Sequence, residues 1–319
     1  MLEKAVGETP LSCAEEYRGK HPELTGVSMA YAGRLDPMAS GKLLVLLGEE
    51  CKNQAAYHGL DKEYGFSVLL GIGSDSHDVL GRLRIDPSLQ TTLPPAGALL
   101  AARPSLTPDG GRVVLETHLA AKGDFQAGNS GGNKPSDRVN HGLAATSALS
   151  ESLIAAANAF TGTIELPYPH FSAKTVHGKP LHMWTLERRL DEIEIPTKES
   201  TVYSLQLDSI ETKSRADVCA EARTKIDSIP EVTEARKALG NDFRRVDVRQ
   251  DWENISHTDS LPDSYHIAHF TCTASSGTYM RTLAHLIGQS LDTSSLAWSI
   301  HRTKIGTYDP SIQAWVKQF

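Results

Sequence analysis

The spacing of hydrophobic residues along the chain predicts several strands. Residues 43–47, LLVLL, form a short apolar run closed by Gly48, and the sequence YGFSVLLGIG follows at 64–73. Two later segments, STVYSLQLDSIE (200–211) and YHIAHFTCTA (265–274), alternate between apolar and polar residues. Short apolar runs between turn residues and strict alternation are both typical of strands, so we expect a strand in each segment.

Two other segments have helical spacing. In ALSESLIAAANAF (148–160), apolar residues recur every three to five positions, and Gly162 follows the last of them. This pattern predicts an amphipathic helix that ends before the glycine. The segment TYMRTLAHLIGQSL (278–291) predicts a second helix near the C-terminal end of the sequence.

Two stretches have little periodicity, and we interpret both as insertions. The first, at about 85–150, is rich in proline, glycine and serine. Its glycine-rich part, 122–142, predicts a flexible loop, because such a composition buries too little apolar surface to offset the entropy of ordering. Earlier in the same stretch, GRVVLETHL (111–119) predicts a strand of an inserted hairpin. The second stretch, 209–263, is charged, and EVTEARKALG (231–240) predicts a helix there.

The composition excludes several classes of protein. The chain has 319 residues, is 39% hydrophobic and carries a net charge of −7, as expected of a globular protein with a large core. It is neither collagen-like nor a polybasic arm that binds nucleic acid through charge alone. Residues 264–319 are the one basic portion, with four basic and two acidic residues.

The four cysteines and the apolar runs indicate the cellular location to expect. Cys13, Cys51, Cys219 and Cys272 never form a CxxC pair, so the sequence suggests neither a zinc site nor a disulfide framework. The longest aliphatic run, 43–47, is too short to cross a bilayer, and the first residues lack an apolar stretch. We expect a cytoplasmic protein that is not embedded in a membrane.

Asp36 is the first candidate for chemistry. It lies in GRLDPMASGKL, between a glycine turn and the predicted strand at 43–47, and Pro37 stiffens the loop. A carboxylate held there can act as a nucleophile or a general base without a metal ion. The structural alternative is an Asp that caps a helix or closes a turn before proline.

Several motifs resemble those of one enzyme family, and they occur in its order. GRLDPMASGKL followed by LGEECK is similar to the G-T-L-D-P-x-A-T-G-x-L and L-G-E-A-T-K signature of TruB-type pseudouridine synthases. Four later segments resemble the family's further motifs: KEYGFSVLLGIGSDSHDVLGRL, PYPHFSAKTVHGKPLH, CTASSGTYMRTLAHLIG and HRTKIGTYD. The resemblance covers 1–84, 151–208 and 264–319.

This resemblance implies a fold class and a domain organisation. The family's catalytic core is an α+β fold, a mixed and largely antiparallel sheet flanked by helices. We therefore expect one catalytic domain over 1–319, with insertions at about 85–150 and 209–263. Family members commonly have an extra C-terminal RNA-binding domain after the last motif, and only about a dozen residues follow Gly306 here. We expect that accessory domain to be absent.

The resemblance also implies an activity: conversion of a uridine in RNA to pseudouridine, most typically uridine 55 in the T loop of tRNA. No cofactor and no metal are implied. The expected partner is the T stem-loop of tRNA, with no membrane and no obligate protein partner, and the expected state is a monomer.

By the same resemblance, Asp36 is the catalytic aspartate and Tyr64 the residue that stacks on the flipped base. The Tyr64 hydroxyl also helps to remove the C5 proton. A guanidinium at Arg281 would keep Asp36 ionised and oriented. Tyr279 and Ile300 are expected to line the pocket. Taken singly, each residue has a plainer reading as a packed strand residue or a solvated charge.

Two positions depart from the family pattern and leave the substrate open. Tyr31 stands where the family has a histidine that helps to hold the target loop, and Arg34 replaces a small residue. Arg34 produces the R-L-D of the sister RluA and RsuA families, which act mostly on ribosomal RNA. We expect both residues to contact substrate. The alternatives are a pseudouridine synthase for another RNA and a non-catalytic RNA-folding chaperone on the same scaffold.

Overall fold

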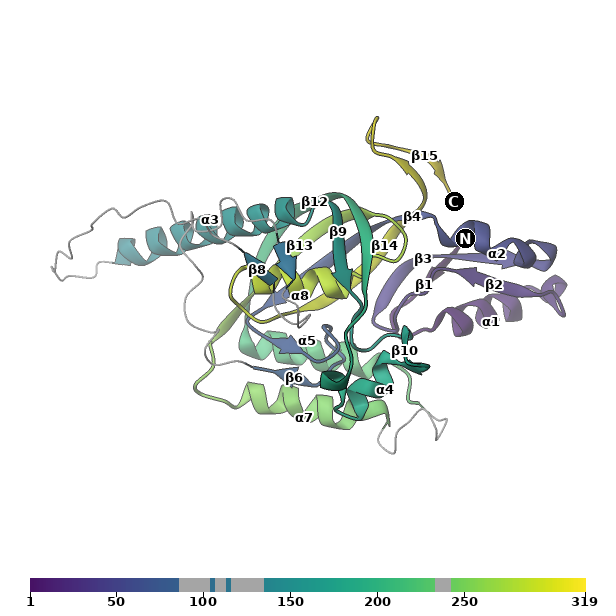
Figure 1. The fold of residues 1–319 in the computed structure, drawn as a ribbon. Helices are drawn as coiled ribbons and strands as arrows, with labels where there is room; N and C mark the ends of the chain where they lie inside the picture. The colour runs from purple at the N-terminus through teal and green to yellow at the C-terminus, as the bar shows by residue number, and fades with distance from the viewer. Residues whose placement is uncertain (86–103, 107–112, 116–134, 233–241) are drawn as a thin grey trace.

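A nine-stranded sheet forms the centre of the molecule (Figure 1). The computed structural model describes residues 1–85, 104–106, 113–115, 135–232 and 242–319. The main path of the sheet runs β1 (Leu2–Lys4), β3 (Ala39–Leu47), β14 (Ser295–Asp309), β4 (Asp61–Leu70), β13 (Ser264–Ala274), β12 (Thr197–Ser214) and β9 (Gly162–Pro167). β2 (Met29–Ala32) pairs with β3, and β15 (Ala314–Gln318) pairs with β14.

The strand predictions and the predicted fold class are confirmed. The four segments with strand-like spacing lie in β3, β4, β12 and β13. In this sheet, β3 and β14 pair in parallel, whereas the other strand pairs are antiparallel. The sheet is therefore mixed and largely antiparallel, with helices packed on it.

Alternation along β13 shows why the sheet has one apolar face. Ala268, Phe270 and Cys272, which point to one face, are buried, whereas His269 and Thr271 between them are only partly buried. The ring of Phe270 stacks on that of its cross-strand neighbour on β4 at 5.4 Å. A sheet that is covered on one face reads as apolar and polar residues in turn, as the sequence of β13 does.

Both predicted helices are present, but the first begins earlier than expected. α8 (Met280–Ser290) confirms the C-terminal helix, and α3 (Pro135–Ala159) contains the predicted one. The loop prediction for 122–142 is therefore wrong from residue 135 onward. A proline fits the first turn of a helix, and the single Gly142 costs about 1 kcal/mol, which a helix anchored in the core tolerates. Residues 122–134 lie outside the described part of the chain.

The two stretches that we interpret as insertions contain regular structure. In the first, β7 (Pro104–Leu106) and β8 (Val113–Leu115) pair antiparallel, which confirms the inserted hairpin. The second contains α5 (Arg215–Asp227) and α7 (Arg245–Ser256), which pack against each other. The helix predicted at 231–240 falls almost entirely on residues outside the described ranges.

The second insertion belongs to the main core. The residues of α5 and α7 that enter the core recur at helical spacing and include Val218, Ala222, Ile226, Val248, Trp252 and Ile255. The Trp252 indole packs edge-on against Trp298 of β14 at 6.0 Å and donates to the carbonyl of Val79 at 3.4 Å. The two helices therefore cover part of the apolar face of the sheet.

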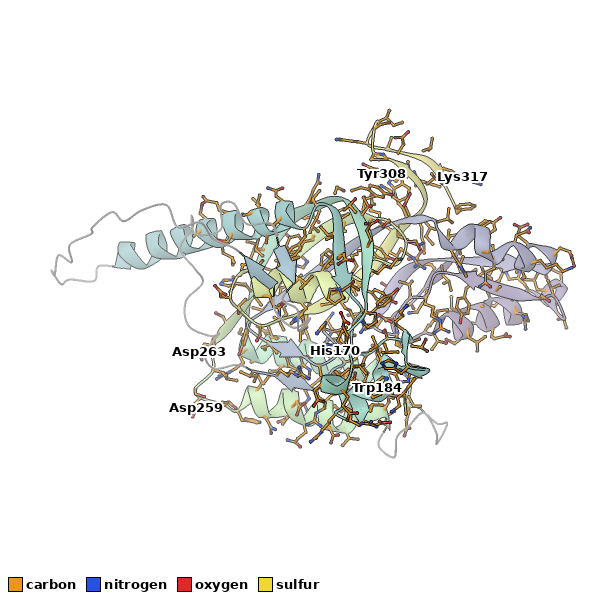
Figure 2. All side chains as sticks on the ribbon, in the orientation of Figure 1. His170, Trp184, Asp259, Asp263, Tyr308 and Lys317 are labelled. Carbon is orange, nitrogen blue, oxygen red and sulfur yellow. The ribbon has the colours of Figure 1, made fainter. Side chains whose placement is uncertain are left out.

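The remaining elements are short. α1 (Pro10–Lys20) and α2 (Gln54–His58) gather with β1 and β2 at one end of the sheet (Figure 1). The others are β5 (Gly73–Ser74), β6 (Leu83–Arg84), β10 (Thr175–Val176), β11 (Lys179–Pro180), α4 (Leu181–Leu186), and the 3₁₀ turns η1 (Pro22–Leu24), η2 (Gly48–Asn53), η4 (Leu190–Glu192) and η5 (Asp242–Arg244). Figure 2 shows Tyr308 and Lys317 on the β14–β15 ribbon, which projects beyond the sheet. None of the helices described here combines the length and the apolar character that crossing a membrane requires.

Candidate active site

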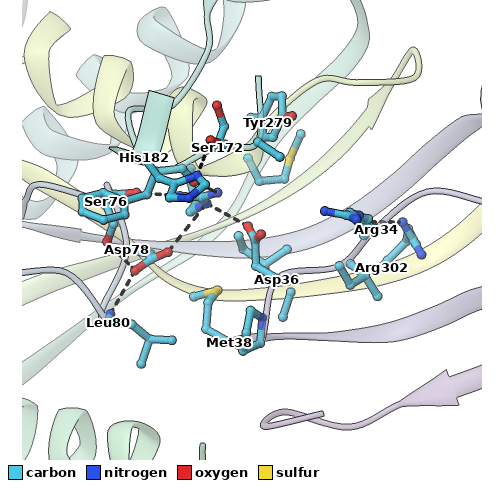
Figure 3. Close-up of a pocket in the computed structure, with 18 of the residues that line it drawn as sticks. Arg34, Asp36, Met38, Ser76, Asp78, Leu80, Ser172, His182, Tyr279 and Arg302 are labelled. Atoms are coloured by element: carbon cyan, nitrogen blue, oxygen red, sulfur yellow. Dashed lines mark hydrogen bonds and ion pairs between the residues drawn. The ribbon is translucent and has the colours of Figure 1, made fainter. Parts of the chain in front are cut away.

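A pocket of about 610 Å³ opens where several segments that are distant in sequence meet (Figure 3). Its wall combines the loop after β2, the β5–β6 hairpin, residues 171–173 and the segment that leads into α8. Six of the residues predicted from sequence line it, namely Arg34, Asp36, Tyr64, Tyr279, Arg281 and Ile300. Tyr31 lies on β2, where its carbonyl accepts from Gln54 Nε2 at 2.8 Å, and it does not line this pocket.

Asp36 is held on a pinned loop with its carboxylate accessible. The amide of Ala39 donates to the Asp36 carbonyl at 3.0 Å, and the amide of Gly7 donates to the Pro37 carbonyl at 2.8 Å. Gly33 begins the loop at a φ of +85°, a conformation that glycine adopts without steric cost. The backbone is therefore fixed, while 40% of the Asp36 side chain remains exposed.

Arg302 ties both ends of this loop together. Its Nε donates to the Lys42 carbonyl at 2.7 Å, and its terminal nitrogens lie 3.3 and 3.5 Å from the carbonyls of Gly33 and Arg34. Gly41 has a φ of +105°, and a Cβ there would overlap the backbone of Arg302. Sequence reasoning did not assign a role to Arg302, although its motif, HRTKIGTYD, was recognised.

Arg281 lies beneath Asp36 and is almost completely buried. Its Nε donates to Asp36 Oδ2 at 2.8 Å and lies 3.6 Å from Asp78 Oδ2. Its other nitrogens donate to the carbonyls of Ser76 at 2.9 Å and Phe171 at 3.3 Å. Burial alone would lower the pKa of Arg281, but the carboxylates of Asp36 and Asp78 raise it, so this cation stays charged.

Asp78 is a site residue that the sequence reasoning missed. It is buried, accepts from Ser76 Oγ at 2.7 Å and from the amide of Leu80 at 3.0 Å, and lies across Arg281 from Asp36. Burial raises the pKa of its carboxyl. The only signal in the sequence was its place in the motif GIGSDSHDVLG, where five consecutive residues are polar and the pattern does not single out Asp78.

Tyr64 lies on β4 at the base of the pocket and is 9% exposed. Burial raises the pKa of its phenol above the ordinary value. At neutral pH the hydroxyl is therefore protonated, so it can donate a hydrogen bond or pass on a proton but does not act as a phenolate base.

Three further residues that were predicted from the sequence, Tyr279, Ile300 and Arg34, line the pocket. Tyr279 immediately precedes α8 and packs edge-on against Tyr168, with ring centres 5.8 Å apart. Ile300 is 6% exposed and lies on β14 between β3 and β4. Arg34 is exposed at the edge of the pocket. An aromatic ring, an aliphatic side chain and a cation thus line the same pocket as Asp36.

Three histidines, of which His77 is buried and His170 and His285 are partly buried, lie near the β5–β6 hairpin. The rings of His77 and His285 stack at 4.0 Å, and His170 lies 5.4 Å from His77. Burial lowers the pKa of all three, that of His285 to about 4, so they are neutral at physiological pH. Within the described ranges, no group of three or more His, Cys, Asp or Glu side chains is placed to bind a metal ion.

Comparisons with known proteins agree with the motifs. Residues 24–93 match the model of the TruB family pseudouridylate synthase (N terminal domain). The tRNA pseudouridine synthase B of Aquifex aeolicus is 23% identical over 69% of this chain and 56% of its own length, and that of Bifidobacterium longum subsp. infantis is 24% identical over 97% and 62%. A solved Cbf5-Nop10-Gar1 complex has a TM-score of 0.42 and 15% identity, over 96% of this chain and 47% of the other. The chain thus spans about half the length of the curated relatives it matches, and it is distantly similar to proteins named tRNA pseudouridine synthase B.

Proposed function

We propose that this protein isomerises a uridine in RNA to pseudouridine. The observation that carries the proposal is the accessible Asp36 carboxylate bonded to the buried Arg281 at a pocket of nucleotide size. The reaction breaks the C1′–N1 bond, turns the uracil and joins C1′ to C5. The C5 proton is released and N1 gains a proton, so the atoms balance without a co-reactant.

The pocket provides for base flipping. A stacked base is out of reach, and extruding it costs a few kcal/mol, which contacts with the extruded base offset. Tyr64 and Ile300 supply an aromatic and an aliphatic surface at the base of the pocket, and Tyr279 adds a second ring at its wall. This combination suits a planar, partly polar uracil.

Asp36 has a role in each route that the chemistry allows. Its carboxylate attacks C1′ of the sugar, attacks C6 of the base, or assists a glycal intermediate. In all three the carboxylate must be aimed at the reacting atom, and Arg281 orients it by donating to Oδ2. The pinned loop around Asp36 supplies the fixed position that nucleophilic attack requires.

The proposed substrate is tRNA, with uridine 55 of the T loop as the target. The relatives named tRNA pseudouridine synthase B support this choice, as does the shared set of motifs. Arg34, exposed at the pocket edge, is the position at which another RNA would be selected instead. Because Tyr31 is not a pocket residue, a substrate contact by Tyr31 would lie away from the reacting base.

The test is incubation of the purified protein with an unmodified tRNA transcript, without added cofactor, followed by mapping of pseudouridine. We expect one modified position, in the T loop, and none in a transcript that carries cytidine there. Modification of a ribosomal RNA fragment alone would move the target to another RNA. If no RNA is modified, the proposed activity is wrong.

A further inference from the structure

The second insertion sends a strained turn to the edge of the pocket. Asp242, Phe243 and Arg244 have φ values of +44°, +50° and +68°, and the last two line the pocket. Positive φ is uncommon for residues other than glycine, because it is energetically unfavourable for them. Strain of this kind persists only where the surroundings enforce it, and it concentrates at functional sites.

A buried ion pair enforces this turn. The Asp242 carboxylate accepts from the amide of Val232 at 2.8 Å and from the guanidinium of Arg245. Arg245 is 4% exposed and also donates to the carbonyls of Ile229 and Pro230. These bonds fix the chain on both sides of the turn, so the strained residues are a built part of the fold.

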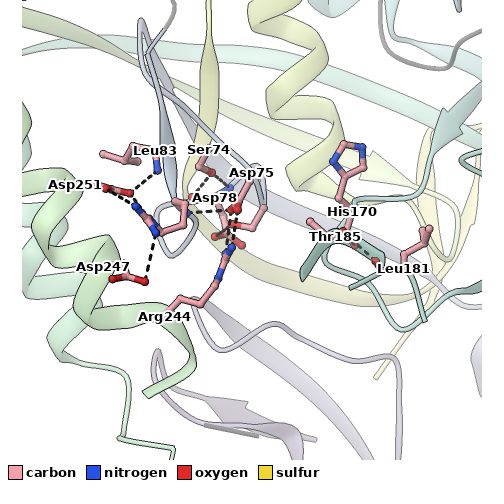
Figure 4. A network of polar contacts seen from close by, with 12 residues as sticks. Ser74, Asp75, Asp78, Leu83, His170, Leu181, Thr185, Arg244, Asp247 and Asp251 are labelled. Carbon is pink, nitrogen blue, oxygen red and sulfur yellow. Dashed lines mark hydrogen bonds and ion pairs between the residues drawn. The ribbon is translucent and has the colours of Figure 1, made fainter. Parts of the chain in front are cut away.

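Contacts run from the turn to the catalytic pair. The guanidinium of Arg244 pairs with both oxygens of Asp75, at 2.6 and 3.0 Å (Figure 4), and lies 4.3 Å over the ring of Phe171. Phe243 packs edge-on against the same ring at 6.4 Å. The Phe171 carbonyl accepts from Arg281, which in turn donates to Asp36. Phe171 and Arg281 thus connect the turn to the Asp36 carboxylate.

Phe243 remains 37% exposed in this position. A phenylalanine that served only to pack would gain more from burial, and a strained backbone would add cost without benefit. An exposed aromatic face beside a nucleotide pocket is the surface on which nucleic acid bases stack. Arg244, held by Asp75, fixes the orientation of that surface.

We propose that Phe243 stacks on a base that flanks the flipped uridine, which makes the turn 242–244 an RNA-contacting element supplied by the insertion. The inference rests on the proposed function for its RNA substrate. It extends that function because it places a substrate contact outside the segments that carry the family motifs.

The test is a double-mutant cycle between protein and RNA. The protein carrying Asp36→Asn, which is expected to prevent turnover, is titrated into a fluorescent RNA with the sequence of a tRNA T stem-loop. Adding Phe243→Ala should weaken binding by roughly tenfold. Two abasic RNAs are compared, one without the base on the 5′ side of the target and one without the base on the 3′ side. One of them should bind the Asp36→Asn protein about tenfold more weakly than intact RNA does. The same abasic RNA and intact RNA should bind the Phe243→Ala protein equally well, because the stacking partner is already missing.

Controls separate stacking from packing. Phe243→Trp should bind RNA with the parent affinity, whereas Phe243→Leu should bind nearly as weakly as Phe243→Ala, because leucine has no aromatic ring. Val246→Ala, a nearby exposed position on α7 outside the pocket lining, should bind as the parent does. Thermal unfolding of each variant identifies any that is misfolded. If Phe243→Ala is misfolded, the affinities of Phe243→Leu and Phe243→Trp are compared instead.

The inference is overturned if Phe243→Leu binds as the parent does, or if Phe243→Ala weakens intact and abasic RNA equally. Because the cycle measures binding alone, it is independent of turnover. If the effects of Phe243→Ala and of the missing base are not additive but the wild type forms no pseudouridine, the proposed activity is wrong and the stacking contact stands. If the wild type forms pseudouridine but the two effects are additive, the activity stands and the stacking contact is wrong. If the protein does not bind RNA at all, both proposals are wrong.

Discussion

Arg281 Nε donates to Asp36 Oδ2 at 2.8 Å, although the two residues are 245 positions apart in the chain. The arginine side chain is 5% exposed and the carboxylate 40% exposed. A buried cation, itself fixed by two carbonyls and Asp78, therefore orients an anion that substrate can reach. This asymmetry is what a nucleophile needs, because the group that orients it is shielded while the reacting atoms stay open.

Arg281→Lys tests this orientation. Lysine keeps the charge but cannot bond Asp36, Ser76 and Phe171 at once, because it lacks the planar fork of the guanidinium. We expect the single-turnover rate to fall about 100-fold, as for a slightly misplaced reacting group, with RNA affinity changed less than about threefold. Arg223→Lys, an exposed position on α5, is the control. A wild-type rate for Arg281→Lys would show that the fork does not position Asp36.

Tyr64→Phe tests the hydroxyl separately from the ring. Stacking should survive, so the Kd should stay within about threefold, whereas the release of the C5 proton should slow by at least 10-fold. Tritium release from 5-³H-uridine RNA measures that step. Tyr203→Phe, which removes a hydroxyl bonded to Asp61 outside the pocket, is the matched control. Equal release by wild type and Tyr64→Phe would exclude a role for the hydroxyl.

Trp252→Ala tests whether the second insertion belongs to the core. The side chain is fully buried, so its loss should lower the free energy of unfolding by about 3–5 kcal/mol, measured by chemical denaturation. Trp315→Ala on the partly exposed β15 should cost less. If the alanine variant does not fold, Trp252→Phe should show a smaller loss in the same direction. A loss below about 1 kcal/mol would mean that α5 and α7 are only loosely attached.

Lys4 predicts a pH dependence of stability. Its side chain is fully buried, and burial lowers its pKa from 10.5 to about 8. Between about pH 8 and 10.5 the folded protein has released this proton while the unfolded chain still holds it. The unfolded state then binds more protons, so the Lys4 contribution to the free energy of unfolding rises with pH, by up to about 3 kcal/mol.

The measurement is the difference in the free energy of unfolding between wild type and Lys4→Met at pH 7 and pH 10. We expect this difference to move in favour of the wild type as pH rises. The comparison of two variants is needed because Cys272 and Tyr265, whose pKa values burial raises to about 12, act in the opposite direction. A difference that is the same at both pH values would contradict the account.

The sequence predicted the parts of the site that lie in motifs. Asp36, Tyr64 and Arg281 could be named because their motifs resemble those of one family, and the structure places all three at one pocket. Tyr31 was expected at the substrate as well, but a motif position does not show which way a strand side chain points. Its place on β2 leaves it outside the pocket lining.

The rest depended on contacts between segments that are remote in sequence. Asp78 and Arg302 act through bonds to Arg281 and to the loop around Asp36, which no local pattern reveals. Phe243 and Arg244 reach the pocket from an insertion with weak patterning. Its helices carry many charges, which dilute the apolar spacing, so α5 and α7 were not predicted within the core.

The most direct test of the central claim is the conversion of an unmodified T stem-loop by wild type and by Asp36→Asn, measured by pseudouridine mapping under single-turnover conditions. Asparagine has the shape of aspartate and can still accept from Arg281, but it lacks the nucleophilic carboxylate. We predict that the wild type converts the target uridine, whereas Asp36→Asn forms no detectable pseudouridine and binds the RNA within about threefold of the wild-type Kd. Conversion by Asp36→Asn at the wild-type rate would contradict the account.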